Sequence, residues 1–330
     1  MRRRIRQSAV AVVVVLLAAW SAVAAPEPAR GIRFAVVGGS PSFTAIWLGV
    51  DTGIFEKYGA RVSLQPMTGS VALDALLGGD IEIAADGPTM VQADPTGSHL
   101  AFIGALQNEF AGWIVYARPG VRSFAELKGQ VVAGTTPAAT ASFAMRNALV
   151  KAGLNPATDV KWLYVNTPAG QLAVLEKGLI AAAALTWPFN FNAEKEGLPK
   201  LADLKEWHLP AAATNLAVKR EWASKNQQTL IAFFKGLIEA TALAKSDKAA
   251  ASKVIAKYLK LTDKTLVDAA YDRFTDVWPN PPYITREAVA EAIRDVPSPD
   301  AKKHMPADFI DNTALDAVVN SGFADQFIKK

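Results

Sequence analysis

A unit that occurs twice along the chain constrains the fold more than any other feature. The segments 52–88 (TGIFEKYGARVSLQPMTGSVALDALLGGDIEIAADGP) and 163–188 (LYVNTPAGQLAVLEKGLIAAAALTWP) each have the order strand, threonine turn, short helix, glycine, strand, turn and proline. Aligned on their threonines, the two copies pair Thr68 with Thr167, Gly79 with Gly178 and, with one residue of slack, Pro88 with Pro188. Two similar α/β lobes are the economical interpretation, and chance similarity between ordinary βαβ units is the alternative.

The rest of the chain divides into an α/β part and a helical part. From Gly31 short apolar runs alternate with helical patterns, which indicates a mixed sheet with crossover helices. Strands are predicted at 33–37, 61–65, 81–85, 100–106, 113–117, 131–133, 160–165, 180–185 and 213–218. After Val218 the pattern predicts helices at 227–245, 248–259, 263–277, 286–295 and 313–320. The predicted fold class is therefore α/β, with a mixed sheet in each of two lobes and a helical C-terminal tail.

Several helix ends can be read from single residues. Ser42 is predicted to cap a helix that ends at Gly53, and Ser123 with Glu126 has the spacing of a capping box. A further helix, at about 138–152, is predicted to end at Gly153. These predicted helix starts and ends lie between the predicted strands, and they support the alternation of strands and helices.

The first residues have the composition of an export signal. A basic start (MRRRIRQ) precedes an apolar run (AVAVVVVLLAAW), and Ala22-Val23-Ala24 offers small residues at a cleavage position. Residues 1–24 are therefore predicted to be a signal peptide, by either the general or the twin-arginine route. The alternative is a membrane anchor, but the apolar run is short against the roughly 20 residues that a span needs.

Charge and cysteine content exclude several classes of function. Subtracting the four arginines of residues 1–24 from the 35 basic residues leaves 31, which equals the 31 acidic residues. A mature chain near neutrality gives no reason to expect a nucleic-acid partner. The absence of cysteine excludes disulfides, thiolate metal sites and a cysteine nucleophile.

The loops that follow the predicted strands contain most of the candidate ligand-binding residues. In open α/β sheets, ligands bind beyond the carboxyl ends of the strands. Six such loops are rich in hydroxyl groups, glycine and proline: 38–43, 68–70, 86–89, 135–142, 166–168 and 186–188. The candidate ligand-binding residues are Ser40, Ser42, Phe43, Trp47, Thr68, Ser70, Asp86, Gly87, Thr136, Thr140, Asn166, Thr167, Thr186, Trp187 and Asn215.

Each of these candidates also has a purely structural interpretation. The serines and threonines at helix starts can be ordinary caps, although a cap beside a cleft can also donate to a ligand. Asp86 can likewise be a cap; if it faces a ligand, it favours a cationic or hydrogen-bond-donating group and disfavours a simple anion. Trp47 and Trp187 can stack on a ligand or fill the core.

Catalysis is not expected from the residues. His99, His208 and His304 are scattered and lack the spacing of metal ligands. The sequence shows no G-x-S-x-G, no H-E-x-x-H and no phosphate-binding glycine loop. We therefore expect a protein that is not an enzyme, with no cofactor and no metal.

Three stretches resemble one family of binding proteins. GIFEKYGARVSL is similar to a G-[IL]-F-E-K-x-G segment of the nitrate/sulfonate/taurine-type substrate-binding proteins of ABC transporters, which share a superfamily with the thiamine-pyrimidine synthases. LLGGDIEIAADGP and NALVKAGLNPATDVKWLYV resemble two further steps of the same family. The likeness runs from about residue 31 to residue 243.

This resemblance implies a type II periplasmic binding fold, in which the chain crosses between the lobes twice. Residues 31–116 and 217–330 would form lobe 1, and residues 117–216 would form lobe 2. The implied protein is a periplasmic monomer that binds a small molecule between its lobes and delivers it to an ABC permease in the inner membrane.

Departures from the family pattern leave the ligand open. Glu82 and Ala181 stand where the family usually has aspartate, and Pro137 precedes two alanines where sulfonate-type pockets often have Gly-Ser. An aromatic or heterocyclic ligand, such as a pyrimidine or an aromatic acid, therefore competes with aliphatic sulfonates. Two other functions remain: an enzyme of the pyrimidine-synthase type, disfavoured because its cysteine-rich motif is missing, and a sensor subunit that presents its closed form to a receptor kinase.

Overall fold

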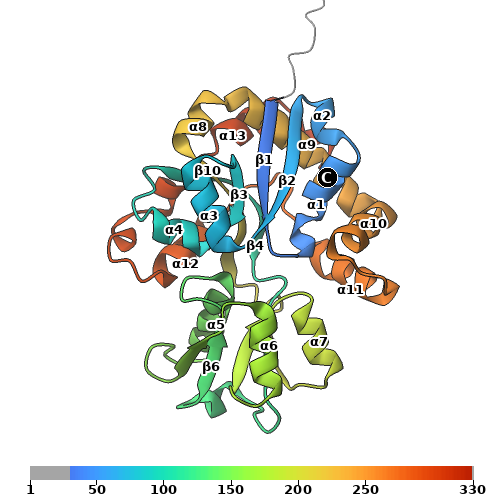
Figure 1. Cartoon of the computed structure of the whole chain (residues 1–330). Helices are drawn as coiled ribbons and strands as arrows, with labels where there is room; N and C mark the ends of the chain where they lie inside the picture. The colour runs from blue at the N-terminus through green and yellow to red at the C-terminus, as the bar shows by residue number, and fades with distance from the viewer. Residues whose placement is uncertain (1–29, 329–330) are drawn as a thin grey trace, which may run out of the picture.

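The fold consists of two five-stranded sheets, each covered by helices and placed one above the other (Figure 1). The computed structural model describes residues 30–328, without the side chains of Arg30 and Asp86. The predicted signal peptide, residues 1–24, lies outside the described residues. We call the first sheet with its helices lobe 1 and the second sheet with its helices lobe 2.

Lobe 1 has the strand order β2-β1-β3-β10-β4. Its strands are β1 (Arg30–Val37), β2 (Ala60–Met67), β3 (Ile83–Asp86), β4 (Leu100–Glu109) and β10 (Pro210–Lys219). β1 pairs in parallel with β2 and β3, whereas β10 lies antiparallel between β3 and β4. The sheet is therefore mixed, as predicted.

Lobe 2 repeats this plan with the order β7-β6-β8-β5-β9. Its strands are β5 (Ile114–Ala117), β6 (Val131–Gly134), β7 (Lys161–Tyr164), β8 (Ala182–Leu185) and β9 (Lys200–Asp203). β6 is parallel to β7 and β8, and β5 lies antiparallel between β8 and β9. Position by position, the two sheets have the same topology, so the predicted fold class is confirmed.

The repeated unit occupies equivalent places in the two lobes. Thr68 and Thr167 are the N-cap residues of α3 (Gly69–Gly78) and α6 (Pro168–Glu176). Gly79 and Gly178 follow these helices with φ angles of 85° and 67°, a left-handed conformation that favours glycine. The threonine therefore marks the start of the equivalent helix in each lobe, and the glycine marks its end.

The chain crosses between the sheets at residues 110–113 and 204–209. The predicted lobe boundaries, after residues 116 and 216, fall inside β5 and β10. Both strands are largely buried, so their apolar sequences run on through the predicted boundaries without a polar break. A change of sheet leaves no local signal in such a sequence.

Helices cover both faces of each sheet (Figure 1). In lobe 1, one face packs against α1 (Thr44–Asp51), α2 (Ile54–Lys57), α9 (Gln227–Ser246), α10 (Lys248–Leu259), α11 (Lys264–Phe274) and α13 (Thr313–Asn320). The other face packs against α3, α4 (Pro88–Ala93) and α12 (Arg286–Asp295). In lobe 2, α5 (Thr140–Lys151) covers one face, and α6 with α7 (Phe189–Lys195) covers the other. A short helix, α8 (Arg220–Lys225), follows β10.

Most local predictions agree with the structure. Each predicted strand and each predicted tail helix is present, while β9 was not predicted. The prediction that Ser42 is a cap is wrong: Ser40 is the N-cap residue of a 3-10 turn at Pro41–Phe43, and its hydroxyl accepts from the Ser42 amide. The reason is that proline at the first helical position starts the turn two residues earlier. Among the described helices, none has the length and apolarity required to cross a membrane.

Two glycines allow α1 and α9 to approach each other around one aromatic ring. A Cβ on Gly49 would lie 2.4 Å from Phe55, and a Cβ on Gly236 would lie 2.6 Å from the same ring. Phe55 is stacked on Phe233 with 5.3 Å between ring centroids. The core of lobe 1 is therefore packed so tightly here that only glycine fits beside the ring.

Candidate functional site

Gly87 of lobe 1 lies close to the first residue of α5 in lobe 2. Gly87 follows β3, and a Cβ on it would lie 2.1 Å from the carbonyl oxygen of Ala212 and 3.6 Å from the Thr140 Oγ1 atom. Ala212 belongs to β10, while Thr140 begins α5 in lobe 2. Glycine is required here because the turn touches another backbone, and the proximity of the two lobes at this turn makes it the candidate binding site.

Asn215 lies beside this contact, on the central strand β10. Its backbone is in register with that of Asp86, the last residue of β3. Its side chain is fully buried, with 0% exposure, and neither the amide nitrogen nor the amide oxygen has a hydrogen-bond partner among the described residues. An amide buried without partners is costly, so a native protein usually satisfies it by a ligand or an ordered water.

A second unpartnered group lies on the neighbouring strand. Gln107 of β4 is in register with Thr214, the residue before Asn215. The Gln107 side chain is buried, and its Oε1 atom has no partner among the described residues. β10 and β4 therefore present unsatisfied amide groups at adjacent register positions.

Trp187 adds a donor from lobe 2. It follows β8, but its ring belongs to the hydrophobic cluster of lobe 1 and lies 5.9 Å from the ring of Phe191, measured between centroids. The ring is only 4% exposed, and its Nε1 atom has no partner in the described part of the chain. The preceding residue, Thr186, borders the first crossing, since its Oγ1 atom would lie 3.3 Å from a Cβ on Gly112.

The predicted residues that follow β1 are of two kinds: hydroxyl groups that pair with each other, and aromatic rings that pack in the core. The Ser42 hydroxyl donates to the Ser40 hydroxyl at 2.9 Å, in a partly buried pair. Phe43 and Trp47 instead lie in the hydrophobic core of lobe 1, with 6.0 Å between their ring centroids. Trp47 is stacked on Tyr258 at 5.0 Å, with an interplanar angle of 7°. This packing accounts for both rings without a ligand.

The remaining predicted residues lie nearer the solvent, at strand ends. Thr68, Ser70, Thr136, Asn166 and Thr167 are exposed. Among them, the Thr167 hydroxyl accepts from the Gly170 amide at 3.0 Å, so its predicted capping role is confirmed. Asn166 has a φ of 62°, a conformation uncommon for a residue with a side chain.

For Asp86 the structure describes only the backbone, so the predicted role of its side chain lies outside the described residues.

An ion pair joins α5 of lobe 2 to α12 of lobe 1. The Arg146 Nε atom of α5 donates to the Asp295 Oδ1 atom at the end of α12 at 2.6 Å, and a second guanidinium nitrogen contacts Oδ2. The two side chains are 18% and 7% exposed. Arg294 donates to the Asn147 Oδ1 atom at 3.0 Å in the same region. No local pattern in the sequence predicts this pair, because 149 residues separate its members.

A second interlobe pair lies near the second crossing. Arg273 of α11 donates to both carboxylate oxygens of Asp203 at the end of β9, at 2.7 and 2.6 Å. Burial alone would raise the pKa of Asp203, but the hydrogen bonds and the charge of Arg273 outweigh burial and lower it. Lys205 donates to the Asp276 carboxylate at 2.9 Å. The cations named at the interlobe boundary are thus each matched by an acid or a polar side chain.

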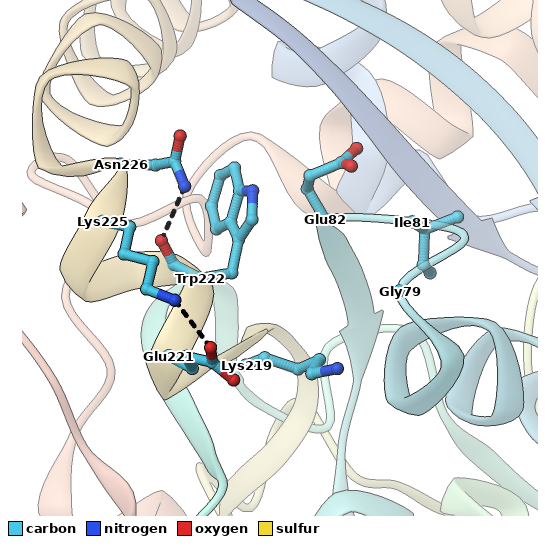
Figure 2. Close-up of a pocket in the computed structure, with 8 residues that line it drawn as sticks. All are labelled: Gly79, Ile81, Glu82, Lys219, Glu221, Trp222, Lys225 and Asn226. Carbon is cyan, nitrogen blue, oxygen red and sulfur yellow. Dashed lines mark hydrogen bonds and ion pairs between the residues drawn. The ribbon is translucent and has the colours of Figure 1, made fainter.

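A cavity of about 250 Å³ lies elsewhere, at the end of lobe 1 beside α8 (Figure 2). Trp222 and Glu82 face each other across it, and its charged groups are satisfied locally. Lys225 donates to Glu221 at 2.7 Å, Lys219 donates to a backbone carbonyl at 3.0 Å, and Glu82 accepts from Arg33. With its charges paired in this way, the cavity is not the candidate site.

Metal ligation has no support in the described residues: they contain no group of three or more His, Asp or Glu side chains that could hold an ion.

Comparison with known proteins identifies relatives of the whole fold. The NMT1-like family model matches residues 34–260, more than half of the chain. The periplasmic aliphatic sulphonate-binding protein SsuA from Escherichia coli is 20% identical with a TM-score of 0.67, over 85% of this chain and 98% of that chain. The periplasmic nitrate-binding protein NrtA from Synechocystis PCC 6803 is 14% identical with a TM-score of 0.70, over 93% of each chain.

A third similar structure is DszB in complex with biphenyl-2-sulfinic acid. It is 14% identical with a TM-score of 0.63, over 88% of this chain and 99% of that chain. No curated protein matches the sequence. The predicted resemblance to sulfonate- and nitrate-type binding proteins and the predicted two-lobed fold are confirmed by the family model and these structures together.

Proposed function

This chain belongs to the NMT1-like family, and from that premise we propose that it is an extracytoplasmic solute-binding protein of an ABC importer. Its ligand is a small organic molecule, either a sulfonate, a pyrimidine-like heterocycle or an aromatic acid. The protein acts as a monomer in the periplasm and delivers the ligand to a permease in the inner membrane. SsuA and NrtA, which are periplasmic binding proteins of similar fold, support this role.

One observation carries the proposal. Asn215 and Gln107, on the two strands that adjoin the crossings, and Trp187, which follows β8, each have a buried polar atom without a partner among the described residues. Unsatisfied groups of this kind are few in native proteins and call for a partner. A ligand held between the lobes would supply that partner, and it would lie at the carboxyl ends of the strands, where α/β proteins bind small molecules.

The proposed cycle uses the two crossings as hinges. Residues 110–113 and 204–209 are short links, so the lobes can rotate about them while each sheet stays intact. Ligand binding would favour the arrangement in which Arg146 pairs with Asp295 and Arg273 pairs with Asp203. The closed protein would then dock on the permease. Of the predicted site residues, Ser40, Ser42, Thr140 and Thr186 would act with Asn215 and Trp187.

Binding is proposed rather than catalysis. The pyrimidine-synthase type of enzyme would need its cysteine-rich motif, and the chain contains no cysteine. DszB, with a bound sulfinic acid, supports the view that this fold accepts aromatic ligands.

The test is thermal unfolding of residues 25–330 with a panel of sulfonates, nitrate, bicarbonate, pyrimidines and aromatic carboxylates. A ligand at 100 times its dissociation constant should add about 2.7 kcal/mol to the free energy of unfolding. Native mass spectrometry of the purified protein checks for a ligand that is already bound. A protein with no ligand bound at purification and no response to any class would contradict the proposal.

A further inference from the structure

Two groups of contacts join the lobes on opposite sides of the molecule (Figure 1). One group connects the end of α11 in lobe 1 to the two crossings, and the other connects α12 in lobe 1 to α5 in lobe 2. We infer that the lobes turn about the end of α11 and separate at the contact between α5 and α12. This inference rests on the proposed function and identifies the side on which the candidate site opens.

The end of α11 is a fixed part of lobe 1. Val267, Tyr271 and Phe274 belong to the hydrophobic core of lobe 1, and Phe274 is 0% exposed. The Tyr271 hydroxyl donates to the backbone carbonyl of Lys245, in α9, at 3.2 Å. The last turn of α11 therefore moves together with the sheet of lobe 1.

This same turn contacts both crossings. The Arg273 guanidinium donates to Asp203, the last residue before the second crossing, and the Arg273 carbonyl accepts from the Lys205 Nζ atom at 2.7 Å. The ring of Phe274 lies against the first crossing, because a Cβ on Gly112 would lie 2.8 Å from its Cζ atom. Two neighbouring residues of one helix thus hold the two links between the lobes.

The contacted parts of the crossings are attached to lobe 2. The Leu204 amide donates to the Trp113 carbonyl at 3.0 Å, which joins the crossings to each other. The Gly112 carbonyl accepts from the Asn190 Nδ2 atom of α7, also at 3.0 Å. In a rotation about two short links, displacement grows with distance from the links, so the contacts of α11 change least. The end of α11 is accordingly the pivot.

The second group of contacts involves no residue of either crossing. Arg146 of α5 pairs with Asp295 at the end of α12, and Arg294 donates to the Asn147 Oδ1 atom at 3.0 Å. Burial does not distinguish this ion pair from the pair at the pivot, since the acids are 7% and 10% exposed. Position does: a rotation that leaves the end of α11 in place separates α5 from α12 and breaks the pair.

The helix that carries this pair also carries a candidate site residue. Thr140 begins α5, and its Oγ1 atom would lie 3.6 Å from a Cβ on Gly87. Arg146 lies six residues further on, about 9 Å along the helix axis. The helix has no glycine or proline at which it could bend, so moving it away from α12 also moves Thr140 away from Gly87. Breaking the pair between Arg146 and Asp295 therefore opens the candidate site.

The experiment measures the separation of the lobes on each side. Because the chain has no cysteine, spin labels can be attached to introduced cysteines alone. Val150→Cys with Ala290→Cys reports on α5 and α12, and Lys195→Cys with Ala269→Cys reports on α7 and α11; all four positions are exposed. Pulsed electron paramagnetic resonance of residues 25–330, without added ligand, gives both distance distributions. Circular dichroism verifies that each labelled chain is folded.

Two substitutions act on the two sides separately. Asp295→Asn should move the α5–α12 distribution to longer distances and leave the α7–α11 distribution unchanged. Gly112→Ala should lengthen the α7–α11 distances, because its Cβ would displace the ring of Phe274. Glu221→Gln, which removes an exposed ion pair with Lys225 within α8, is the control and should alter neither distribution.

The inference is overturned if Asp295→Asn changes neither distribution, lengthens both equally, or lengthens only the α7–α11 distances. It is also overturned if a folded Gly112→Ala chain keeps the α7–α11 distances of the unmodified protein. The measurement uses no ligand, so it can be separated from the proposed function. A chain that moves as expected but binds no member of the ligand panel contradicts the proposed function, and a chain that binds a ligand but separates elsewhere contradicts only this inference.

Discussion

Replacing Asp295 by asparagine tests the pair that joins α5 of lobe 2 to α12 of lobe 1. Asp295→Asn preserves the shape of the side chain but removes its charge and one of the two acceptors that Arg146 uses. Arg146 retains its hydrogen bond to the Pro137 carbonyl at 2.8 Å, so the guanidinium is not left without any partner. The substitution therefore isolates the contribution of the interlobe contact.

The magnitude follows from burial. Breaking a fully buried ion pair costs about 3–5 kcal/mol, and an exposed pair is worth about 0.2–1 kcal/mol. The Asp295 side chain is 7% exposed and the Arg146 side chain is 18% exposed, so the pair lies near the buried limit. Since asparagine still accepts one hydrogen bond, we expect a loss of about 2 kcal/mol in the free energy of unfolding.

The assay is urea unfolding of residues 25–330 followed by circular dichroism. The matched control is Glu221→Gln, which breaks an i,i+4 pair with Lys225 whose side chains are 73% and 69% exposed. That change should cost less than about 0.5 kcal/mol. Because the Asp295 pair forms only when the lobes are in contact, Asp295→Asn should also weaken ligand binding by about tenfold, while Glu221→Gln should not.

Two results would refute this reasoning. One is a cost for Asp295→Asn no larger than that of Glu221→Gln, which would mean that the pair contributes no net stability. The other is a double-mutant cycle with Arg146→Gln in which the two single costs add without coupling, which would mean that Asp295 acts through other contacts.

Three further predictions concern the core and the second interlobe pair. Trp47→Ala should cost about 3–5 kcal/mol in urea unfolding while ligand affinity stays unchanged, and a loss of affinity alone would place this ring in the binding site. Gly236→Ala should cost about 1–3 kcal/mol, because its Cβ would overlap Phe55; a thermal midpoint equal to that of the unmodified protein would contradict the tight packing. The lowered pKa of Asp203 adds stability that is present above the unfolded-state pKa of about 3.9 and is lost as pH falls through the folded-state pKa. Asp203→Asn should therefore flatten the acid limb of a plot of unfolding free energy against pH, and an unchanged limb would show that the pair with Arg273 has no net effect.

Local signals in the sequence account for most of the fold. Periodicity predicted the strands and tail helices because it depends only on neighbouring residues. The edge strand β9 was missed because its four residues, Lys200–Asp203, show no clear alternation. Ser42 was mistaken for a cap because Ser40, two residues earlier, has the same chemistry, and the position of Pro41 decides between them.

The candidate site was only partly accessible from the sequence. The rule that ligands bind at strand ends selected Trp187 among its candidates, but it also selected Phe43, which packs in the core; Asn215 and Trp47 were candidates from outside the strand-end loops. Gln107 was missed because it lies within a strand, where a polar residue gives no indication of its partners. A buried polar residue in a strand that reads as apolar is the signal that could have found it.

The sequence by itself determined two α/β units and a helical tail, because strands, helices and their caps are encoded by residues close together in the chain. Only the tertiary structure decided which groups meet at the junction of the lobes. Arg146 and Asp295 come together across 149 residues, and Trp187 leaves its own lobe to pack in the core of the other. Which buried amides lack a partner also depends on every neighbouring strand.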